Sequence, residues 1–479
     1  MTTETNPAFE TEIGTARILR QPRSFGRGRS ECVLDHFRCP DIFLDFSLAQ
    51  ELSSVSGYFR FGQNVTCYGR TCRGDLDPHI ETSRYDALND TVTNDDTVCL
   101  PFDPDEVIDN LRLERYADNR PSSNILRTAY YLLRPLTTLW MRKQIQRFHA
   151  RNWRDFRLPQ WPVDTTVEST CETLLLLSMQ AKRVASVPFI WFWPHGAHGC
   201  VTMTHDVESE AGRDFCKELM DVDDSFGVKA SFQIVPEERY TVSSNLIDTI
   251  RNRGFEVGVQ DLNHDGRLFD NKEQFVRRAA IVNRYAKEYE AKGFRAAVLY
   301  RRPDWYDSFD FSFDMSMPNV AHLDPQRGGC CTVMPYFIGR ILEIPVTTTQ
   351  DYTLFHILNQ RSIDLWKTQI DLILKKNGLA SFIVHPDYII EQETRSIYKQ
   401  LLSHLTELRS RSDVWFALPG EIDSWWRTRR QLRVERFGES WRIVGEGAER
   451  ATLAYAKDVD GKLVYELATS PGSSVTSRQ

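Results

Sequence analysis

The sequence predicts an α/β fold whose second half forms a distorted (β/α) barrel of about seven units. From roughly residue 200 to residue 430, short apolar stretches rich in β-branched and aromatic residues alternate with longer amphipathic stretches. This alternation is typical of parallel strands joined by crossover helices. The number of such units favours a closed barrel over an open sheet. We expect an N-terminal α+β extension before the barrel and a small antiparallel β module after it.

The individual elements of the barrel can be placed from the same pattern. Strands are expected at 200–205, 229–235, 255–260, 295–300, 341–347, 379–385 and 414–418. Helices are expected at 208–225, 243–253, 272–291, 362–377 and 391–410. Residues 303–340 are rich in Pro, Gly and Asp, and we expect a long loop there over the mouth of the barrel. Long loops of this kind usually carry function.

Changes in composition give the expected domain boundaries. They are a disordered tail at 1–25, the extension at 26–190, the barrel at 191–430, the β module at 431–468 and a second disordered tail at 469–479. The β module is inferred from apolar residues that recur with a period of two and from Asp460-Gly461, a pair that favours a hairpin turn. The aromatic cluster at 188–194 directly precedes the first barrel strand and is expected either to pack in the core, which is the commoner case, or to form a wall of a sugar site.

Composition excludes several classes of protein. The chain has 479 residues, of which 41% are hydrophobic and 26% are charged, so a large core is expected and global disorder is not. A net charge of −7 gives no sign of a nucleic-acid partner. No apolar run approaches the ~18 residues of a membrane span, and Met1–Gly14 lacks the apolar core of a secretory signal. We therefore expect a cytoplasmic protein with free thiols, since its 10 cysteines include no Cys-x-x-Cys pair.

The segment 128–156 has two interpretations. It mixes Tyr, Leu and Trp with many Arg and Lys residues, as in a basic amphipathic helix that lies on a membrane surface. A peripheral membrane contact is one expectation. The other is a helix docked on the main domain with its arginines directed to solvent, which is the commoner arrangement for an amphipathic helix.

Polar residues gather where the predicted barrel strands end. Cys200-Val-Thr-Met-Thr-His-Asp-Val-Glu208 reads as a buried strand that delivers two carboxylates, Asp206 and Glu208, at its carboxyl end. Two such carboxylates can divide the work of base and metal ligand, although acidic residues also commonly begin helices. Similar polar stretches follow the predicted strands at 255–260, 295–300 and 379–385. Several polar constellations at one edge of a barrel indicate a site.

These stretches resemble the motifs of the polysaccharide deacetylase family, the NodB-like carbohydrate esterases. Thr204-His-Asp-Val-Glu208 is similar to the acidic first motif, and Glu256-Val-Gly-Val-Gln-Asp-Leu-Asn-His264 is similar to the Glu-Val-Gly-x-His-x-x-x-His motif. Arg301-Arg-Pro303 is similar to the Arg-x-Pro motif, and Phe382-Ile-Val-His385 to the late strand that ends in a histidine. The resemblance spans about residues 195–430 and implies a NodB-like barrel.

The resemblance also implies roles for individual residues. Asp206 would be the general base, Arg301 would pair with Asp206, and His385 would protonate the leaving group. A divalent metal, most often Zn²⁺, would be held by a second set of residues: Glu208, Gln260 and His264.

Two of the implied metal ligands depart from the family pattern of Asp, His and His. Glu208 lengthens the first arm by one methylene, and Gln260 replaces a histidine. An amide oxygen is a poor ligand for zinc, although harder ions accept it. Three neighbouring side chains are alternative ligands: Asp261, Asn263 and Asp265.

The resemblance implies a metal-dependent hydrolase that removes an acyl group from an N- or O-acylated sugar or glycan precursor. Because Gln260 replaces a ligand, one alternative is a glycan-binding protein that keeps the barrel without turnover. Another is a hydrolase of a different non-peptide C–N bond, which the fold alone does not exclude.

Overall fold

The computed structural model describes residues 28–74, 76–79, 81–82, 85–117, 144, 147, 151–411 and 413–468. The two predicted tails and most of the segment 128–156 lie outside these residues, so those predictions stay untested. Within the described ranges no helix is both long enough and apolar enough to cross a membrane. All 10 cysteines are free thiols, as expected.

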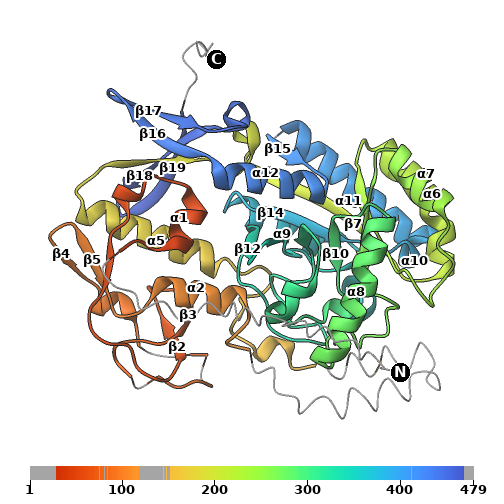
Figure 1. Ribbon diagram of the computed structural model, residues 1–479, viewed down its shortest axis with the longest axis horizontal. Helices are drawn as coiled ribbons and strands as arrows, with labels where there is room; N and C mark the ends of the chain where they lie inside the picture. Colours follow the sequence, from red (N-terminus) through yellow and green to blue (C-terminus); the bar gives the residue numbers. More distant parts are fainter. Residues whose placement is uncertain are drawn as a thin grey trace, which may run out of the picture.

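A ring of seven parallel strands forms the centre of the described chain (Figure 1). In chain order they are β7 (Gly199–Val207), β8 (Ala230–Ile234), β9 (Glu256–Gln260), β10 (Gly293–Arg295), β11 (Phe313–Asp314), β13 (Ile341–Glu343) and β14 (Leu379–Ile383). Hydrogen bonds join them in the order β13-β11-β10-β9-β8-β7-β14. The ring closes between β13 and β14, where Thr347 Oγ1 donates to the Leu379 carbonyl at 2.6 Å and Thr348 N donates to the Ser381 carbonyl at 3.3 Å. The predicted distorted barrel is confirmed.

Burial explains why these segments are strands. All nine residues of β7 are buried, as expected for a parallel strand that is covered on both faces. The covering helices on the outside of the barrel are α6 (Glu210–Ser225), α7 (Ser244–Asn252), α8 (Lys272–Glu288), α9 (Asp364–Leu374) and α11 (Gln392–Arg411). Side chains cap the first turns of several of them, including Ser209 before α6 and Asn271 before α8. These five helices lie where the sequence predicted helices.

Two predictions for the barrel were wrong, and a third strand was predicted correctly but lies off the ring. The strand predicted at 295–300 is β10, which ends at Arg295, and Val298 and Leu299 have left-handed backbone angles that a strand does not contain. Residues 303–340 are not one loop, because they contain the barrel strand β11 and β12 (Tyr336–Ile338), which pairs antiparallel with β13. The strand predicted at 414–418 is β15 (Val414–Phe416), which pairs with β7 and lies off the ring. A strand as short as β11 is too short to show a periodic pattern.

The N-terminal extension combines helices and small sheets. Its main elements are α1 (Glu31–Phe37), β1 (Phe46–Leu48), β2 (Gly57–Arg60), β3 (Thr66–Gly69), β4 (Val92–Asn94), β5 (Thr97–Leu100), α2 (Pro104–Arg112), α5 (Thr166–Ala181) and β6 (Ser186–Ile190). β2 and β3 form a hairpin, and β1, β5 and β4 form a three-stranded sheet.

The C-terminal β module is bound to the extension. After α12 (Pro419–Gln431), it consists of two hairpins, β16 (Arg433–Phe437) with β17 (Ser440–Val444) and β18 (Leu453–Val459) with β19 (Lys462–Leu467). β18 also pairs antiparallel with β6 of the extension, so one sheet contains strands from before and after the barrel. The module also contacts α1, since the rings of Phe37 and Tyr465 have centroids 6.3 Å apart, and α1 lies beside β18 and β19 in Figure 1.

A buried carboxyl group lies where the extension meets the barrel. Glu168 on α5 is 1% exposed and accepts hydrogen bonds from Thr332 Oγ1 and, at 3.2 Å, from Val333 N. Burial raises the pKa of Glu168 to about 7, although the hydrogen bond from Thr332 opposes that shift. The native protein therefore holds this proton at a pH at which an unfolded chain has released it.

We expect Glu168 to make the fold less stable as the pH rises from about 4.5 to above 7, by up to about 3 kcal/mol, because the native state must then bury a charge. Glu168→Gln should flatten this part of the stability profile and raise the free energy of unfolding at pH 8. Urea unfolding at pH 5 and pH 8 measures both effects. Glu288→Gln, an exposed site on α8, serves as the control. Parallel profiles for Glu168→Gln and the wild type would contradict the expectation.

Candidate active site

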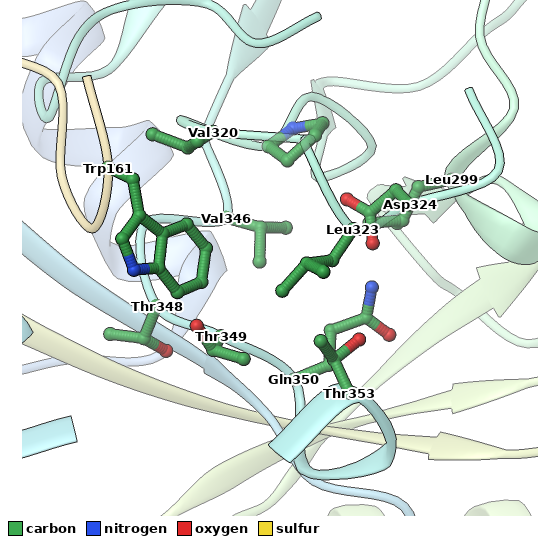
Figure 2. A pocket seen from close by; sticks show the side chains of 11 residues that line it. Trp161, Leu299, Val320, Leu323, Asp324, Val346, Thr348, Thr349, Gln350 and Thr353 are labelled. Carbon is green, nitrogen blue, oxygen red and sulfur yellow. The ribbon is translucent and has the colours of Figure 1, made fainter. Parts of the chain in front are cut away.

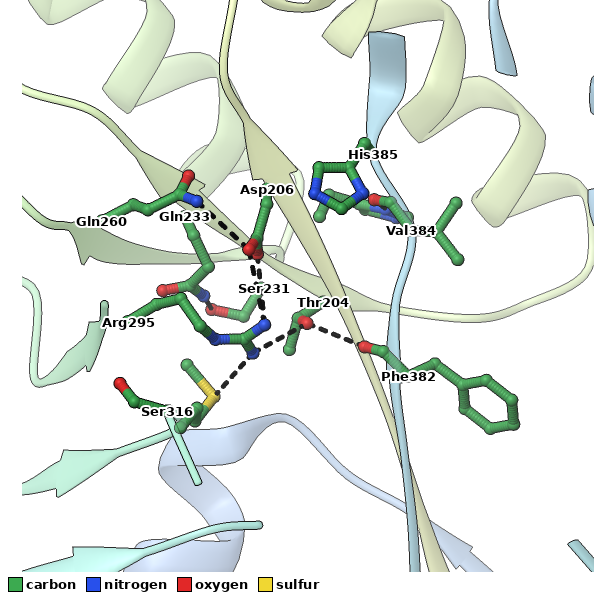
Figure 3. A network of polar contacts seen from close by, with 12 residues as sticks. Thr204, Asp206, Ser231, Gln233, Gln260, Arg295, Ser316, Phe382, Val384 and His385 are labelled. Atoms are coloured by element: carbon green, nitrogen blue, oxygen red, sulfur yellow. Dashed lines mark hydrogen bonds and ion pairs between the residues drawn. The ribbon is translucent and has the colours of Figure 1, made fainter. Parts of the chain in front are cut away.

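The carboxyl ends of four barrel strands bring the polar residues together (Figure 3). Asp206 lies near the end of β7, Gln260 ends β9 and Arg295 ends β10. His385 follows β14 by two residues, and Glu208 directly follows β7. Parallel strands end at one edge of their sheet, so side chains that are far apart in sequence meet there.

Asp206 is held by two neighbours. Its Oδ1 lies 3.3 Å from Arg295 Nη1, and its Oδ2 accepts a hydrogen bond from Gln260 Nε2 at 3.2 Å. The carboxylate is almost fully buried, and burial raises its pKa, while the charge of Arg295 opposes the shift. Arg295 is itself fixed, because its Nη2 donates to Thr204 Oγ1 at 3.0 Å. Asp206 is thus a buried carboxylate with one cationic partner.

The prediction that Arg301 pairs with Asp206 was wrong. The Arg301 guanidinium bonds both carboxylate oxygens of Glu114 in the extension, with Nε donating at 2.8 Å, and its Nη1 donates to the Leu299 carbonyl at 2.7 Å. It ties the loop after β10 to the extension. Arg295, instead of Arg301, forms the ion pair with Asp206. The sequence analysis did not identify Arg295 as a site residue, because the strand was expected to begin at this residue, whereas it ends there. The other site residues were found because polar residues at the carboxyl ends of parallel strands indicate a site. With the strand bounds correct, the same rule would have indicated Arg295.

Glu208 lies among three nitrogen atoms. Its Oε1 is 2.7 Å from His264 Nε2, 3.3 Å from Gln260 Nε2 and 3.5 Å from His385 Nε2. Burial alone would raise the pKa of Glu208, but the charge and hydrogen bond of His264 hold it well below its usual value. Burial would likewise lower the pKa of His264, but Glu208 raises it. Both groups therefore favour their charged forms.

His385 is oriented by a residue that the sequence analysis missed. Its Nδ1 lies 2.6 Å from Asp351 Oδ1, and its backbone N donates to Asp351 Oδ2 at 2.8 Å. Burial would lower the pKa of His385, but Asp351 and then Glu208 raise it well above its usual value. Asp351 follows β13 by eight residues, at the start of a helical turn that leads into the π-helix Thr353–Ile357. The only signal in the sequence for Asp351 as a site residue is that it follows the strand predicted at 341–347.

The residues present fit a divalent cation. Asp206, Glu208 and His385 offer ligand atoms that all lie within 4.8 Å of one another, and carboxylates with an imidazole suit Zn²⁺. His264 adds a further nitrogen beside Glu208. Gln260 reaches the predicted place, but it directs its amide nitrogen at the carboxylates, and that nitrogen cannot bind a metal. The Gln260 Oε1 is buried and makes no hydrogen bond.

A small cavity lies among the segments that follow β10, β11 and β13 (Figure 2). It is lined by Trp161, Leu299, Pro318, Val320, Leu323, Asp324, Val346, Thr348, Thr349, Gln350 and Thr353. Gln350, one of the lining residues, directly precedes Asp351 in the chain. Its volume of ≈ 20 Å³ has room for about one water molecule, which is too little for a sugar.

Comparisons with known proteins show where the fold recurs. No family model and no curated protein matches the sequence. Among solved structures, one from Mycobacterium smegmatis named as a polysaccharide deacetylase is 16% identical, with a TM-score of 0.42 over 52% of this chain and 98% of that chain. PuuE allantoinase is 12% identical, with a TM-score of 0.38 over 49% of this chain and 92% of that chain. A CE4 family pseudoenzyme from Bacillus anthracis is 15% identical, with a TM-score of 0.29 over 47% of this chain and 65% of that chain. The similar structures thus include polysaccharide deacetylases, as the motifs predicted, and the likeness concerns the fold.

The hydrogen bond between Asp351 and His385 gives a prediction that needs no substrate. Asp351→Asn removes the charge that holds the proton on His385, so burial should dominate and the pKa of His385 should fall. Titration of the His385 ring signal by NMR, in protein treated with a chelator, measures the change. Asp304→Asn, an exposed residue near the barrel mouth, should leave that pKa unchanged. An unaltered His385 titration in Asp351→Asn would show that another group holds the proton.

Proposed function

We propose that this protein is a hydrolase that removes an acyl group from an N- or O-acylated sugar or glycan precursor. One observation carries the proposal. A buried carboxylate, Asp206, and a buried imidazole, His385, have polar atoms within 4.8 Å of each other, and each has its own charged partner. A carboxylate base and a histidine acid at such a separation can both reach one acyl group.

Asp206 is suited to act as the base. Its raised pKa makes it a stronger proton acceptor than an exposed aspartate, while Arg295 favours the ionised form that can accept a proton. His385 is suited to act as the acid. Because its Nδ1 is bound to Asp351, the proton that it can release is the one on Nε2, which faces Glu208 and the centre of the site.

Asp206 and His385 each transfer one proton in the proposed reaction. Asp206 takes a proton from the water that attacks the acyl carbon, and His385 Nε2 gives a proton to the departing amine or alcohol oxygen. The acyl group leaves as a carboxylic acid. Asp206 then returns its proton to solvent and His385 regains one, so the site is restored.

The metal ligands are proposed separately. We assign cation binding to Glu208 and His264, because His385 needs the proton on Nε2 to act as the acid, and His264 would release its Nε2 proton when the cation binds. When bound, a divalent cation would polarise the acyl carbonyl and lower the pKa of water. Gln260, placed between Asp206 and Glu208, positions both carboxylates through its amide hydrogens.

Asp206→Asn should lower the rate of acyl release by ~10²–10⁴, because an amide cannot accept the proton from water. Acetate released from acetylated xylo-oligosaccharides and N-acetylated chito-oligosaccharides measures the rate. Asp307→Asn, on the exposed surface, is the matched control. Wild-type turnover in Asp206→Asn would assign the base to another residue. No acetate from any acylated glycan with the wild-type protein, with or without added Zn²⁺, would contradict the proposed function.

Gln260→His should tighten Zn²⁺ binding on the order of tenfold or more, because imidazole is a better zinc ligand than an amide. Equilibrium dialysis with elemental analysis measures the affinity, and Gln392→His on the surface of α11 controls for adventitious binding. A parallel rise in turnover would mean that the natural site is limited by metal. Tighter binding without turnover would favour a site that has lost catalysis. An unchanged affinity would place residue 260 outside the metal site.

A further inference from the structure

A second concave site lies on the extension side of the molecule. Its volume is ≈ 530 Å³, within the range of small-ligand sites. We call it the aromatic groove, and it is lined by Gln63, Asn64, Thr66, Trp153, Arg154, Phe156, Arg157, Leu158, Gln160, Trp161, Asp164, Thr166 and His322. Trp161 also lines the small cavity that contains Gln350 (Figure 2), so the two concave sites share this side chain.

His322 indicates that the aromatic groove is built for a ligand. This side chain is 3% exposed, yet neither ring nitrogen has a hydrogen-bond partner of normal geometry. Burial lowers the pKa of His322 to about 4, and the nearby Leu158 backbone opposes this only in part, so the ring is neutral. A neutral imidazole offers one donor and one acceptor, and the Leu158 backbone can pair with only one of them, so the other is left unpaired at a cost in free energy. A polar ligand in the groove would satisfy that group.

The aromatic side chains provide flat apolar surface next to polar groups. The rings of Trp153 and Trp161 meet edge to face with centroids 4.8 Å apart, and Phe156 packs against His322 at 5.4 Å. Trp153, Phe156 and Trp161 are all partly exposed. An aromatic ring of this kind has an apolar face next to solvent-exposed polar groups. This arrangement matches a sugar, whose C–H groups can stack on the ring while its hydroxyl groups form hydrogen bonds. The exposed amides of Gln63 and Asn64 provide donors and acceptors for hydroxyl groups.

The free charges that line the aromatic groove are positive. Arg154 and Arg157 are exposed, and the Arg154 guanidinium lies 4.9 Å from the centre of the Trp153 ring. The acidic residue of the lining, Asp164, is fully buried, and its oxygens accept hydrogen bonds from the backbone N of Gln160 and Thr166. A guanidinium group favours carboxylate or phosphate. The Glu81 carboxylate lies next to the lining, where it accepts hydrogen bonds from the backbone N of Arg157 and Leu158, and the two exposed arginines outnumber it. The groove therefore favours a sugar that carries negative charge.

We propose that the aromatic groove is a second carbohydrate-binding site, which holds an acidic sugar unit of a glycan away from the acyl group that is removed. This deepens the proposed function and rests on it for the identity of the polymer. Trp153 supplies the stacking surface, His322 the buried hydrogen-bonding groups and Arg154 the preference for negative charge.

The test measures binding without hydrolysis. Isothermal titration calorimetry on the full chain carrying Asp206→Asn would compare two tetrasaccharides, one of alternating glucuronic acid and N-acetylglucosamine and one of N-acetylglucosamine alone. At low salt we expect the acidic probe to bind roughly tenfold more tightly. Trp153→Ala and His322→Phe, which keeps a ring against Phe156, should each weaken both probes on the order of tenfold. Arg154→Gln should lower only the affinity for the acidic probe, to the level of the neutral one.

Trp441→Ala is the matched control, since Trp441 is a partly exposed tryptophan of the C-terminal hairpin that packs against Phe43. Wild-type affinity in both Trp153→Ala and His322→Phe would overturn the proposal. Equal losses in Trp441→Ala would also overturn it, and equal affinity of the two probes would overturn the charge preference. Because the readout is binding, a wild-type protein that binds these probes in the groove but releases no acetate would refute the proposed hydrolase and leave the aromatic groove as a binding site.

Discussion

The buried ion pair between Arg295 and Asp206 is the interaction on which the site depends. Arg295 is fully buried, and its partner on β7 is almost as buried, so each charge relies on the other for compensation. Removing one member of such a pair typically costs about 3–5 kcal/mol, because the remaining charge stays in a medium of low polarity. The Arg295 guanidinium extends from β10 to Thr204 and Asp206 on β7. It thereby connects two strands that are separated in the sheet by β8 and β9. Orientation of the catalytic carboxylate and integrity of the barrel interior thus depend on one side chain.

The interior below Arg295 is unusually acidic. Asp314 on β11 faces Glu343 on β13 at the same register, and both are buried. Burial first, and then the charge of Asp314, raise the pKa of Glu343 well above its usual value. Burial and the neighbouring carboxylate thus favour the neutral form of Glu343, whose Oε1 accepts a hydrogen bond from Met317 N at 2.9 Å. The charge of Arg295 opposes this shift, so the guanidinium interacts with Glu343 as well as with Asp206.

The sequence was sufficient to predict the parts of the site that follow long strands. β7 and β14 are continuous buried runs, so Asp206, Glu208 and His385 could be placed at their ends. Arg295 ends a strand of three residues, and a nearby Arg-x-Pro pattern drew the prediction to Arg301 instead. Asp351 begins a short helical turn that runs into a π-helix, and so short a turn gives no periodic pattern in the sequence. The pairing of β18 with β6 joins strands on opposite sides of the barrel sequence, and no local pattern could show it.

The closure of the barrel between β13 and β14 has a consequence for the acid of the site. Hydroxyl groups of Thr347 and Thr348 make most of the hydrogen bonds at this seam, in place of a regular backbone ladder. Asp351 lies on one side of the seam and His385 on the other. A fluctuation that parts the seam would therefore also separate the imidazole from the carboxylate that keeps it protonated. Local opening between β13 and β14 and the pKa of His385 are therefore coupled.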